Sequence, residues 1–281
     1  MLIHTVDQWN PLWLSHLQKN QRIGLVPTMG ALHEGHLDLI RKSIQQTDFT
    51  IVSIFVNPIQ FNHPEDFQKY PNTLDADLSK LESLGVDYVF LPEVTTIYPA
   101  QPNLKMDFGD LETILEGKFR PGHFNGVGIV VAKLFHLIRP QVAFFGQKDL
   151  QQVAVIKRLV QDLSFPIELQ VIPTRREQDG LAMSSRNLRL TKEQRQKSLT
   201  LFQSLSDAKG ALLRGEKWSQ VKENISARFN QIPDCQLEYF ELVHPETFNL
   251  FQEFDPHMKS SICVAAYIGD IRLIDNMPVQ D

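Results

Sequence analysis

A buried strand, a glycine-containing turn, a helix and a second buried strand follow one another between residues 23 and 56. The two strands are expected at residues 23–27 and 49–56, and the helix between them carries Leu37, Leu39, Ile40 and Ile44. Two apolar strands joined by a helix are typical of a βαβ unit in a parallel sheet, because both faces of such a sheet are covered. This unit restricts the fold more than any other feature of the sequence.

The alternation of strands and helices continues to residue 172. A helix follows with Leu74, Leu78, Leu81 and Leu84 at helical spacing, and then come strands at 88–91, 142–145 and 167–172 and helices at 127–138 and 150–163. Strands that alternate with helices predict an α/β fold with a Rossmann-like, doubly wound parallel sheet. Ligands of such sheets bind at the carboxyl ends of the strands, so we expect functional residues there.

The pattern changes after Pro173. A polar segment with the turn signal Asp179-Gly180 leads into helices at 192–213 and 217–229 and strands at 237–243, 262–267 and 271–275. Gly269-Asp270 joins the last two strands, as in a tight hairpin. The sequence therefore predicts a Rossmann-like domain over residues 1–175 and a smaller α+β domain over residues 176–281, which would cover the active site.

Composition restricts the possible partners and location. The chain has 281 residues and a formal net charge of −5, whereas nucleic-acid-binding proteins usually carry a basic face. We find no signal peptide and no stretch of about 20 apolar residues that could span a membrane. Cys235 and Cys263 lack metal-site spacing and indicate reduced, buried thiols. We expect a cytoplasmic protein without nucleic-acid or membrane partners.

The first candidate site connects the first strand of the βαβ unit to its helix. Gly30 lets the backbone approach a ligand closely, and a helix N-terminus suits a phosphate. His33 and His36 share one face of a helical turn, so they can donate hydrogen bonds to charge that develops at phosphorus. Either histidine could instead be a core residue, or the pair could bind a metal, which the positive helix end disfavours.

Two further candidate sites follow other strands. Gln60 comes just after the second strand, where its amide suits a substrate with a carboxylate and hydroxyls, although it could also cap a loop. The connection over residues 62–66 could form a lid. Lys148 lies at the next strand-to-helix junction and can neutralise a phosphate, Asp149 can cap the helix, and Gln152 lies on its first turn.

A fourth candidate site is the segment Met183, Ser184, Ser185 and Arg186 in the polar connection. Two hydroxyls and a guanidinium can bind a triphosphate, although the same residues are common in loops. The chain has neither a Walker lysine motif nor a Gly-x-Gly-x-x-Gly motif, which argues against kinases and dehydrogenases. The four sites together favour an anionic nucleotide.

The segment from Met29 to His36 resembles the form that the His-x-Gly-His nucleotidyltransferase signature takes in the pantothenate synthetase family. Residues 183–186 resemble the second signature of that superfamily. The blocks 57–61, 120–124, 145–149 and 179–183 also follow the order and spacing of the family. The resemblance covers nearly the whole chain, and the blocks together are far more specific than any one of them.

The resemblance implies an ATP-dependent ligase that forms pantoyl adenylate and then pantothenate from β-alanine, with Mg²⁺ as cofactor and a homodimeric assembly. His36 would be the proton donor, and the other catalytic residues would be His33, Lys148, Ser184, Ser185 and Arg186. Gln60 would bind pantoate and β-alanine, and Gln152 would bind pantoate. The ATP site would comprise Met29, Gly30, Ala31, Leu32, His33, Glu34, Gly35, His36, Gly146, Gln147, Lys148, Asp149, Arg175, Met183, Ser184, Ser185 and Arg186.

Three positions depart from the family pattern. Gln147 replaces a common glutamate, and Arg175 replaces a residue that is usually apolar. Ala76 lies where some members carry an extra acid, so the resemblance implies that Mg²⁺ is held mainly by ATP, with Asp77 as a candidate protein ligand. Two alternatives remain: another nucleotidyltransferase that stops at a nucleotide–substrate adduct, and a nucleotide sensor that has lost catalysis.

Overall fold

The computed structural model describes residues 1–62 and 64–280, and these form two compact units. The first unit contains residues 1–147 and 155–173, and the second contains residues 148–154 and the chain from Thr174 onward. The second unit thus begins two residues before the predicted boundary and also includes the start of a helix from the α/β region. The predicted lid over residues 62–66 includes His63, which lies outside the described residues.

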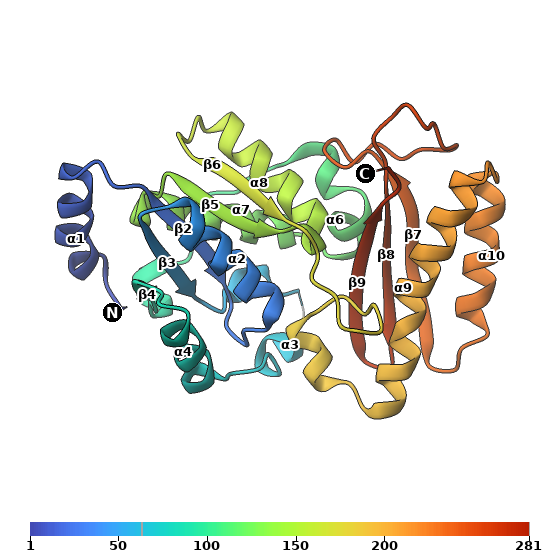
Figure 1. Ribbon diagram of the computed structural model, residues 1–281, viewed down its shortest axis with the longest axis horizontal. Helices are drawn as coiled ribbons and strands as arrows, with labels where there is room; N and C mark the ends of the chain where they lie inside the picture. The colour runs from blue at the N-terminus through green and yellow to red at the C-terminus, as the bar shows by residue number, and fades with distance from the viewer. Residues whose placement is uncertain (63, 281) are drawn as a thin grey trace. The chain divides into compact units, whose positions relative to one another are not determined.

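The first unit contains a six-stranded sheet in which every pairing is parallel (Figure 1). Its order is β1-β4-β3-β2-β5-β6, so the chain leaves the central β2 first toward β3 and later toward β5. The carboxyl ends of β2 and β5 therefore lie at the point where the strand order reverses, which is where doubly wound sheets bind ligands. The strands are β1 (Leu2–Ile3), β2 (Ile23–Thr28), β3 (Phe49–Ile54), β4 (Tyr88–Phe90), β5 (Val142–Gly146) and β6 (Glu168–Ile172).

Helices cover this sheet. On one face, Leu37 and Ile40 of α2 and Leu81 of α4 join a core with strand residues that include Val52 and Phe144. Strand residues that alternate with these, including Leu25, Ile51 and Ala143, are also fully buried, so both faces are covered. The helices are α1 (Val6–Gln18), α2 (Glu34–Gln46), α3 (Pro64–Gln68), α4 (Leu74–Ser83), α5 (Val94–Ile97), α6 (Leu115–Phe119), α7 (His123–Ile138) and α8 (Leu150–Asp162), with short 3-10 turns η1 (Pro58–Gln60), η2 (Gly109–Glu112) and η3 (Gln147–Asp149).

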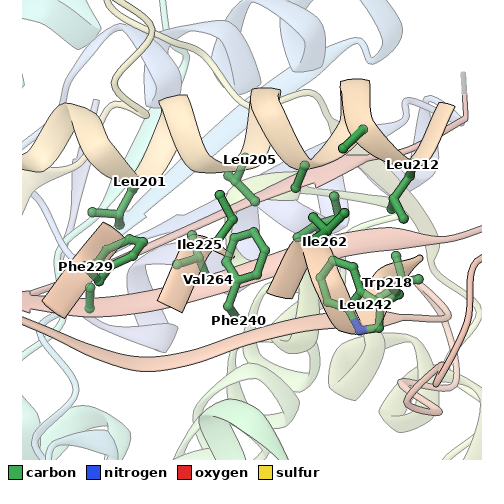
Figure 2. Packing of buried hydrophobic residues seen from close by; sticks show 14 of the residues in the cluster. Leu201, Leu205, Leu212, Trp218, Ile225, Phe229, Phe240, Leu242, Ile262 and Val264 are labelled. Atoms are coloured by element: carbon green, nitrogen blue, oxygen red, sulfur yellow. The ribbon is translucent and has the colours of Figure 1, made fainter. Parts of the chain in front are cut away.

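The second unit is an α+β domain, as the sequence predicts. Its sheet is antiparallel in the order β7-β8-β9, with β7 (Cys235–Val243), β8 (Ser261–Ile268) and β9 (Ile271–Pro278). Figure 2 shows Leu205 of α9 (Lys192–Leu213) and Phe229 of α10 (Trp218–Asn230) in one core cluster with Phe240 of β7. The predicted hairpin joins β8 to β9 at Gly269, whose φ is 59°.

Two elements differ from the sequence-based expectation. We predict α7 from Val127, where the apolar run begins, but the helix starts at His123, behind Gly122 as N-cap. The N-terminal α1 is not predicted, although Thr5 and Gln8 form a capping box at its start. Among the residues that the structure describes, no helix combines the length and apolar character needed to cross a membrane.

Candidate active site

The turn after β2 contains two successive residues in the left-handed region, Gly30 with a φ of 79° and Ala31 with a φ of 50°. This conformation is costly for alanine, by about 1–2 kcal/mol, so other contacts must hold it. The N–H groups of Ala31 and Leu32 supply them, because each donates to one carboxylate oxygen of Asp77 at 2.8 Å. Asp77 is only 1% exposed. The loop is therefore anchored to α4 by a buried carboxylate.

Two further hydrogen bonds fix Asp77 and the loop. Its Oδ2 also accepts a hydrogen bond from Thr73 Oγ1 at 3.1 Å, and Lys80 of the same helix donates to the Leu32 carbonyl at 2.6 Å. In the described part of the chain, no three or more His, Cys, Asp or Glu side chains form a cluster that could hold a metal ion. The geometry thus supports Asp77 as the anchor of the loop, and the expected role of Asp77 in Mg²⁺ binding stays a prediction.

His33 and His36 lie together at the start of α2. His33 is the N-cap residue, and the two ring centroids are 4.1 Å apart. The backbone N–H of His33 donates to Nδ1 of His36 at 3.3 Å. A ring nitrogen that accepts a hydrogen bond carries no proton, so His36 holds its proton on Nε2. His36 can therefore act as a hydrogen-bond or proton donor through Nε2, at the carboxyl end of β2.

The structure places Gln60 next to this loop. Gln60 ends η1 after β3 and is buried, and its Nε2 lies 3.1 Å from Sδ of Met29, the first residue of the loop. Its Oε1 accepts a hydrogen bond from Asn57 Nδ2 at 3.0 Å. The two candidate sites that the sequence places after β2 and after β3 thus lie side by side in the first unit.

The third candidate site follows β5. Gly146 is the last residue of that strand, and Gln147, Lys148 and Asp149 form η3, which leads into α8. Lys148 Nζ lies 3.8 Å from Asp149 Oδ1, and the lysine side chain is 17% exposed. Gln152 is half-buried on the first turn of α8.

Within the second unit, β9 holds the backbone of Lys148. The side-chain amide of Asn276 donates to the Lys148 carbonyl at 2.9 Å. The neighbouring Asp275 is buried and binds Arg176 with both carboxylate oxygens, at 2.6 and 3.0 Å. Arg176 also donates to the carbonyls of Gly180 and Asn276, both at 3.1 Å. This network joins the lysine segment and the polar connection to one strand.

The polar connection is a hairpin with the predicted turn at its tip. Arg176 pairs with Ala182 in an antiparallel bridge, and Met183 N donates to the Arg175 carbonyl at 3.0 Å. Arg195 of α9 donates to Glu177 and Asp179, and its hydrogen bonds lower the pKa of Asp179. The hairpin is therefore fixed from two sides, by β9 and by α9.

The second signature follows this hairpin. Ser184 caps η4 (Ser185–Arg189), and its Oγ accepts a hydrogen bond from Arg186 N at 3.3 Å. Ser185 is buried and Arg186 is half-buried, whereas Arg175 is exposed. Residues 183–186 are thus held in a defined turn directly after the fixed hairpin. The roles of Arg176, Asp275 and Asn276 are not predicted from the sequence, because their partners lie far away along the chain.

The sequence model of the family described as "Pantoate-beta-alanine ligase" matches residues 1–278. The pantothenate synthetase of Cytophaga hutchinsonii is 44% identical over 263 residues, which are 93% of each chain. The pantothenate synthetase of Thermoanaerobacter pseudethanolicus is 48% identical over 258 residues, which are 92% of this chain and 90% of that one.

Solved structures agree with these relatives. The pantothenate synthetase of Thermus thermophilus superposes with a TM-score of 0.91 at 37% identity, covering 100% of this chain and 99% of the other. The pantoate–β-alanine ligase of Francisella tularensis, solved with β,γ ATP and β-alanine, gives a TM-score of 0.82 at 37% identity over 99% and 97% of the two chains. This chain therefore belongs to the pantoate–β-alanine ligase family.

Proposed function

We propose that the chain joins pantoate to β-alanine and converts ATP to AMP and pyrophosphate. A carboxylate oxygen of pantoate attacks the α-phosphorus of ATP, and the bond to pyrophosphate breaks. The amine of β-alanine then attacks the acyl carbon of pantoyl adenylate, AMP leaves with the bridging oxygen, and the amine loses a proton. The contact between Gln60 and Met29 carries this proposal, because it places the Gln60 amide beside the His33–His36 loop.

In this proposal, His36 stabilises the charge that forms on the phosphate during the first step. The donor is Nε2–H, since Nδ1 already accepts the N–H of His33. His33 lies against it and assists. Lys148, Ser184, Ser185 and Arg186 bind the phosphates, because ammonium, hydroxyl and guanidinium groups complement a triphosphate. The remaining ATP contacts are those implied by the family resemblance, from Met29 to Gly35 and at Gly146, Gln147, Asp149, Arg175 and Met183.

Pantoate binds to amides in this proposal. Gln60 contacts pantoate and lies near β-alanine, and Gln152 contacts pantoate. Amides can hold the two hydroxyls and the carboxylate without pairing the carboxylate as tightly as a bidentate arginine would. The carboxylate then remains able to attack phosphorus.

Three parts of the proposal rest on the family resemblance. Mg²⁺ enters as part of Mg-ATP, because the buried Asp77 carboxylate is engaged by the loop. The chain forms a homodimer, and it acts in the cytoplasm. Sedimentation of the purified protein tests the dimer, and the dependence of activity on Mg²⁺ at fixed ATP tests the metal.

The proposal is tested by omitting one substrate at a time. With ATP, pantoate and β-alanine all present, AMP and pantothenate should form in equal amounts. Without β-alanine, AMP should not exceed about one equivalent of enzyme, because the adenylate stays bound. A protein that makes an adduct with another acid, and no amide from β-alanine, would instead be a different nucleotidyltransferase.

A further inference from the structure

The orientation of the Asn57 side chain is fixed by a backbone carbonyl. Asn57 is 1% exposed, and one end of its amide lies 3.1 Å from the carbonyl oxygen of Gly126 in α7. A carbonyl oxygen only accepts hydrogen bonds, so the NH₂ group of Asn57 must face it. The same NH₂ group lies 3.0 Å from the Gln60 amide.

This orientation determines which end of the Gln60 amide faces the loop. Because the NH₂ group of Asn57 donates toward Gln60, the carbonyl oxygen of Gln60 must face Asn57. The NH₂ group of Gln60 is then directed away from Asn57 and toward Met29, 3.1 Å from its sulfur. A substrate at this place meets a hydrogen-bond donor and not an acceptor.

Tyr98 completes the chain of hydrogen bonds. Its hydroxyl lies 2.8 Å from Oδ1 of Asn57, the end of the amide that neither Gly126 nor Gln60 engages. Tyr98 lies at the C-terminus of α5 and is 7% exposed. Burial raises the pKa of Tyr98, so the hydroxyl keeps its proton and acts as the donor. Tyr98 therefore donates a hydrogen bond to Asn57, and Asn57 donates one to Gln60.

The backbone around Gln60 is also fixed. A side chain on Gly126 would place its Cβ 2.6 Å from the Ile59 carbonyl oxygen and 2.8 Å from the Gln60 Cα, so η1 packs on α7 through a glycine. His123 Nδ1 lies 2.8 Å from the Gln60 carbonyl oxygen and must donate to it, since that oxygen only accepts. Neither the backbone nor the side chain of Gln60 can turn without breaking one of these contacts.

We propose that Tyr98 and Asn57 are positioning residues that hold Gln60 with its NH₂ group toward the acid substrate. The inference rests on the proposed function, which assigns Gln60 to pantoate. It adds that the site selects a substrate with an oxygen acceptor opposite Gln60. Tyr98 does not contact the substrate in this arrangement and acts through Asn57.

The experiment compares Tyr98→Phe with Tyr88→Phe. Tyr88 begins β4, and its hydroxyl binds His16 Nε2 at 2.8 Å, so each variant removes one tyrosine hydroxyl bonded to a buried side chain. Tyr98→Phe should raise the KM for pantoate about three- to tenfold and leave kcat and the KM for ATP nearly unchanged. Tyr88→Phe should change none of these constants. Equal effects of the two variants on the KM for pantoate would overturn the inference.

Asn57→Asp provides a second variant with the same shape. An ionised carboxylate cannot donate to Gly126 or to Gln60, so the Gln60 amide should reverse and present its oxygen to the substrate. The KM for pantoate should rise about 10- to 100-fold, with the larger effect on KM rather than on kcat. A folded Asn57→Asp with the wild-type KM would contradict the inference. If the wild type itself uses no pantoate, the proposed function fails. If the wild type uses pantoate but Tyr98→Phe and Asn57→Asp keep the wild-type KM for pantoate, only the positioning role fails.

Discussion

The carboxylate of Asp77 accepts the backbone N–H of Leu32 at 2.8 Å, from a position 45 residues further along the chain. Its other oxygen accepts the N–H of Ala31 at the same distance. The segment that carries His33 and His36 is therefore shaped by a side chain that needs no contact with ligand. In this arrangement the carboxylate of Asp77 organises the backbone of the His33–His36 loop, whereas the family resemblance suggests a metal ligand.

Asp77→Asn tests this distinction. The variant replaces one acceptor oxygen by an NH₂ group that faces an N–H donor, so the free energy of unfolding should fall by about 1–3 kcal/mol. The KM for ATP should rise, because the loop loses its anchor, but the Mg²⁺ concentration for half-maximal activity should not change. Asp75→Asn, at an exposed position of the same helix, is the control. A higher Mg²⁺ requirement with unchanged stability would restore the metal role.

His36→Ala should lower kcat by about 10²- to 10³-fold, the loss expected for one donor to the developing phosphate charge. The fold should persist, since the turn is held mainly through the amides of Ala31 and Leu32. Steady-state kinetics and circular dichroism measure the two effects. His136→Ala removes an exposed histidine from α7 and should change neither kcat nor the circular dichroism spectrum. A wild-type kcat for His36→Ala, or unfolding of this variant, would indicate that His36 is a core residue and not the donor.

Gln60→Ala and Gln152→Ala should each raise the KM for pantoate strongly, since a lost hydrogen bond to a buried partner costs about 1–3 kcal/mol. The KM for ATP should change far less. Lys148→Ala should show the opposite pattern and mainly weaken ATP use and turnover. Both constants are measured for all three variants. Separate subsites for pantoate and ATP are excluded if the glutamine variants weaken both substrates equally.

Arg176→Ala should be strongly destabilising. The side chain of Asp275 is 2% exposed, and removal of one partner from a buried ion pair costs about 3–5 kcal/mol. Arg22→Ala breaks an exposed pair with Glu168 and should cost about 0–1 kcal/mol. Denaturant unfolding gives both values. The KM for ATP should also rise for Arg176→Ala, because the hairpin before Ser184 is released from β9. Equal losses of stability in the two variants would refute the anchoring role.

Periodicity and turn residues were sufficient to predict most of the fold. The helix at 192–213 has the predicted bounds, and each strand of the βαβ unit ends within two residues of its prediction. The two-residue β1 is not predictable from local sequence, because it exists through its pairing with β4. The start of α7 is missed since Gly122 and Gly126 are typical of loops, although Gly122 is the N-cap of the helix and Gly126 packs closely against Ile59 and Gln60.

The candidate site also contains residues that the sequence predicts and residues that it does not. Residues at strand ends, such as His36 and Gln60, can be selected from the sequence because a doubly wound sheet gathers functional groups there. The long-range pairs that fix the surrounding segments cannot, because their contacts join positions 41 to 99 residues apart. Tyr98 with Asn57 and Arg176 with Asp275 are examples at these separations. Such pairs depend on how helices and strands pack, which local patterns do not encode.

The most direct test of the account is the exchange of labelled pyrophosphate into ATP. One nucleotide site and an adenylate intermediate require that exchange depends on pantoate and proceeds without β-alanine. Label should appear in ATP when enzyme, Mg-ATP, labelled pyrophosphate and pantoate are mixed, and none should appear when pantoate is left out. Exchange that appears only after β-alanine is added would contradict a two-step reaction through pantoyl adenylate.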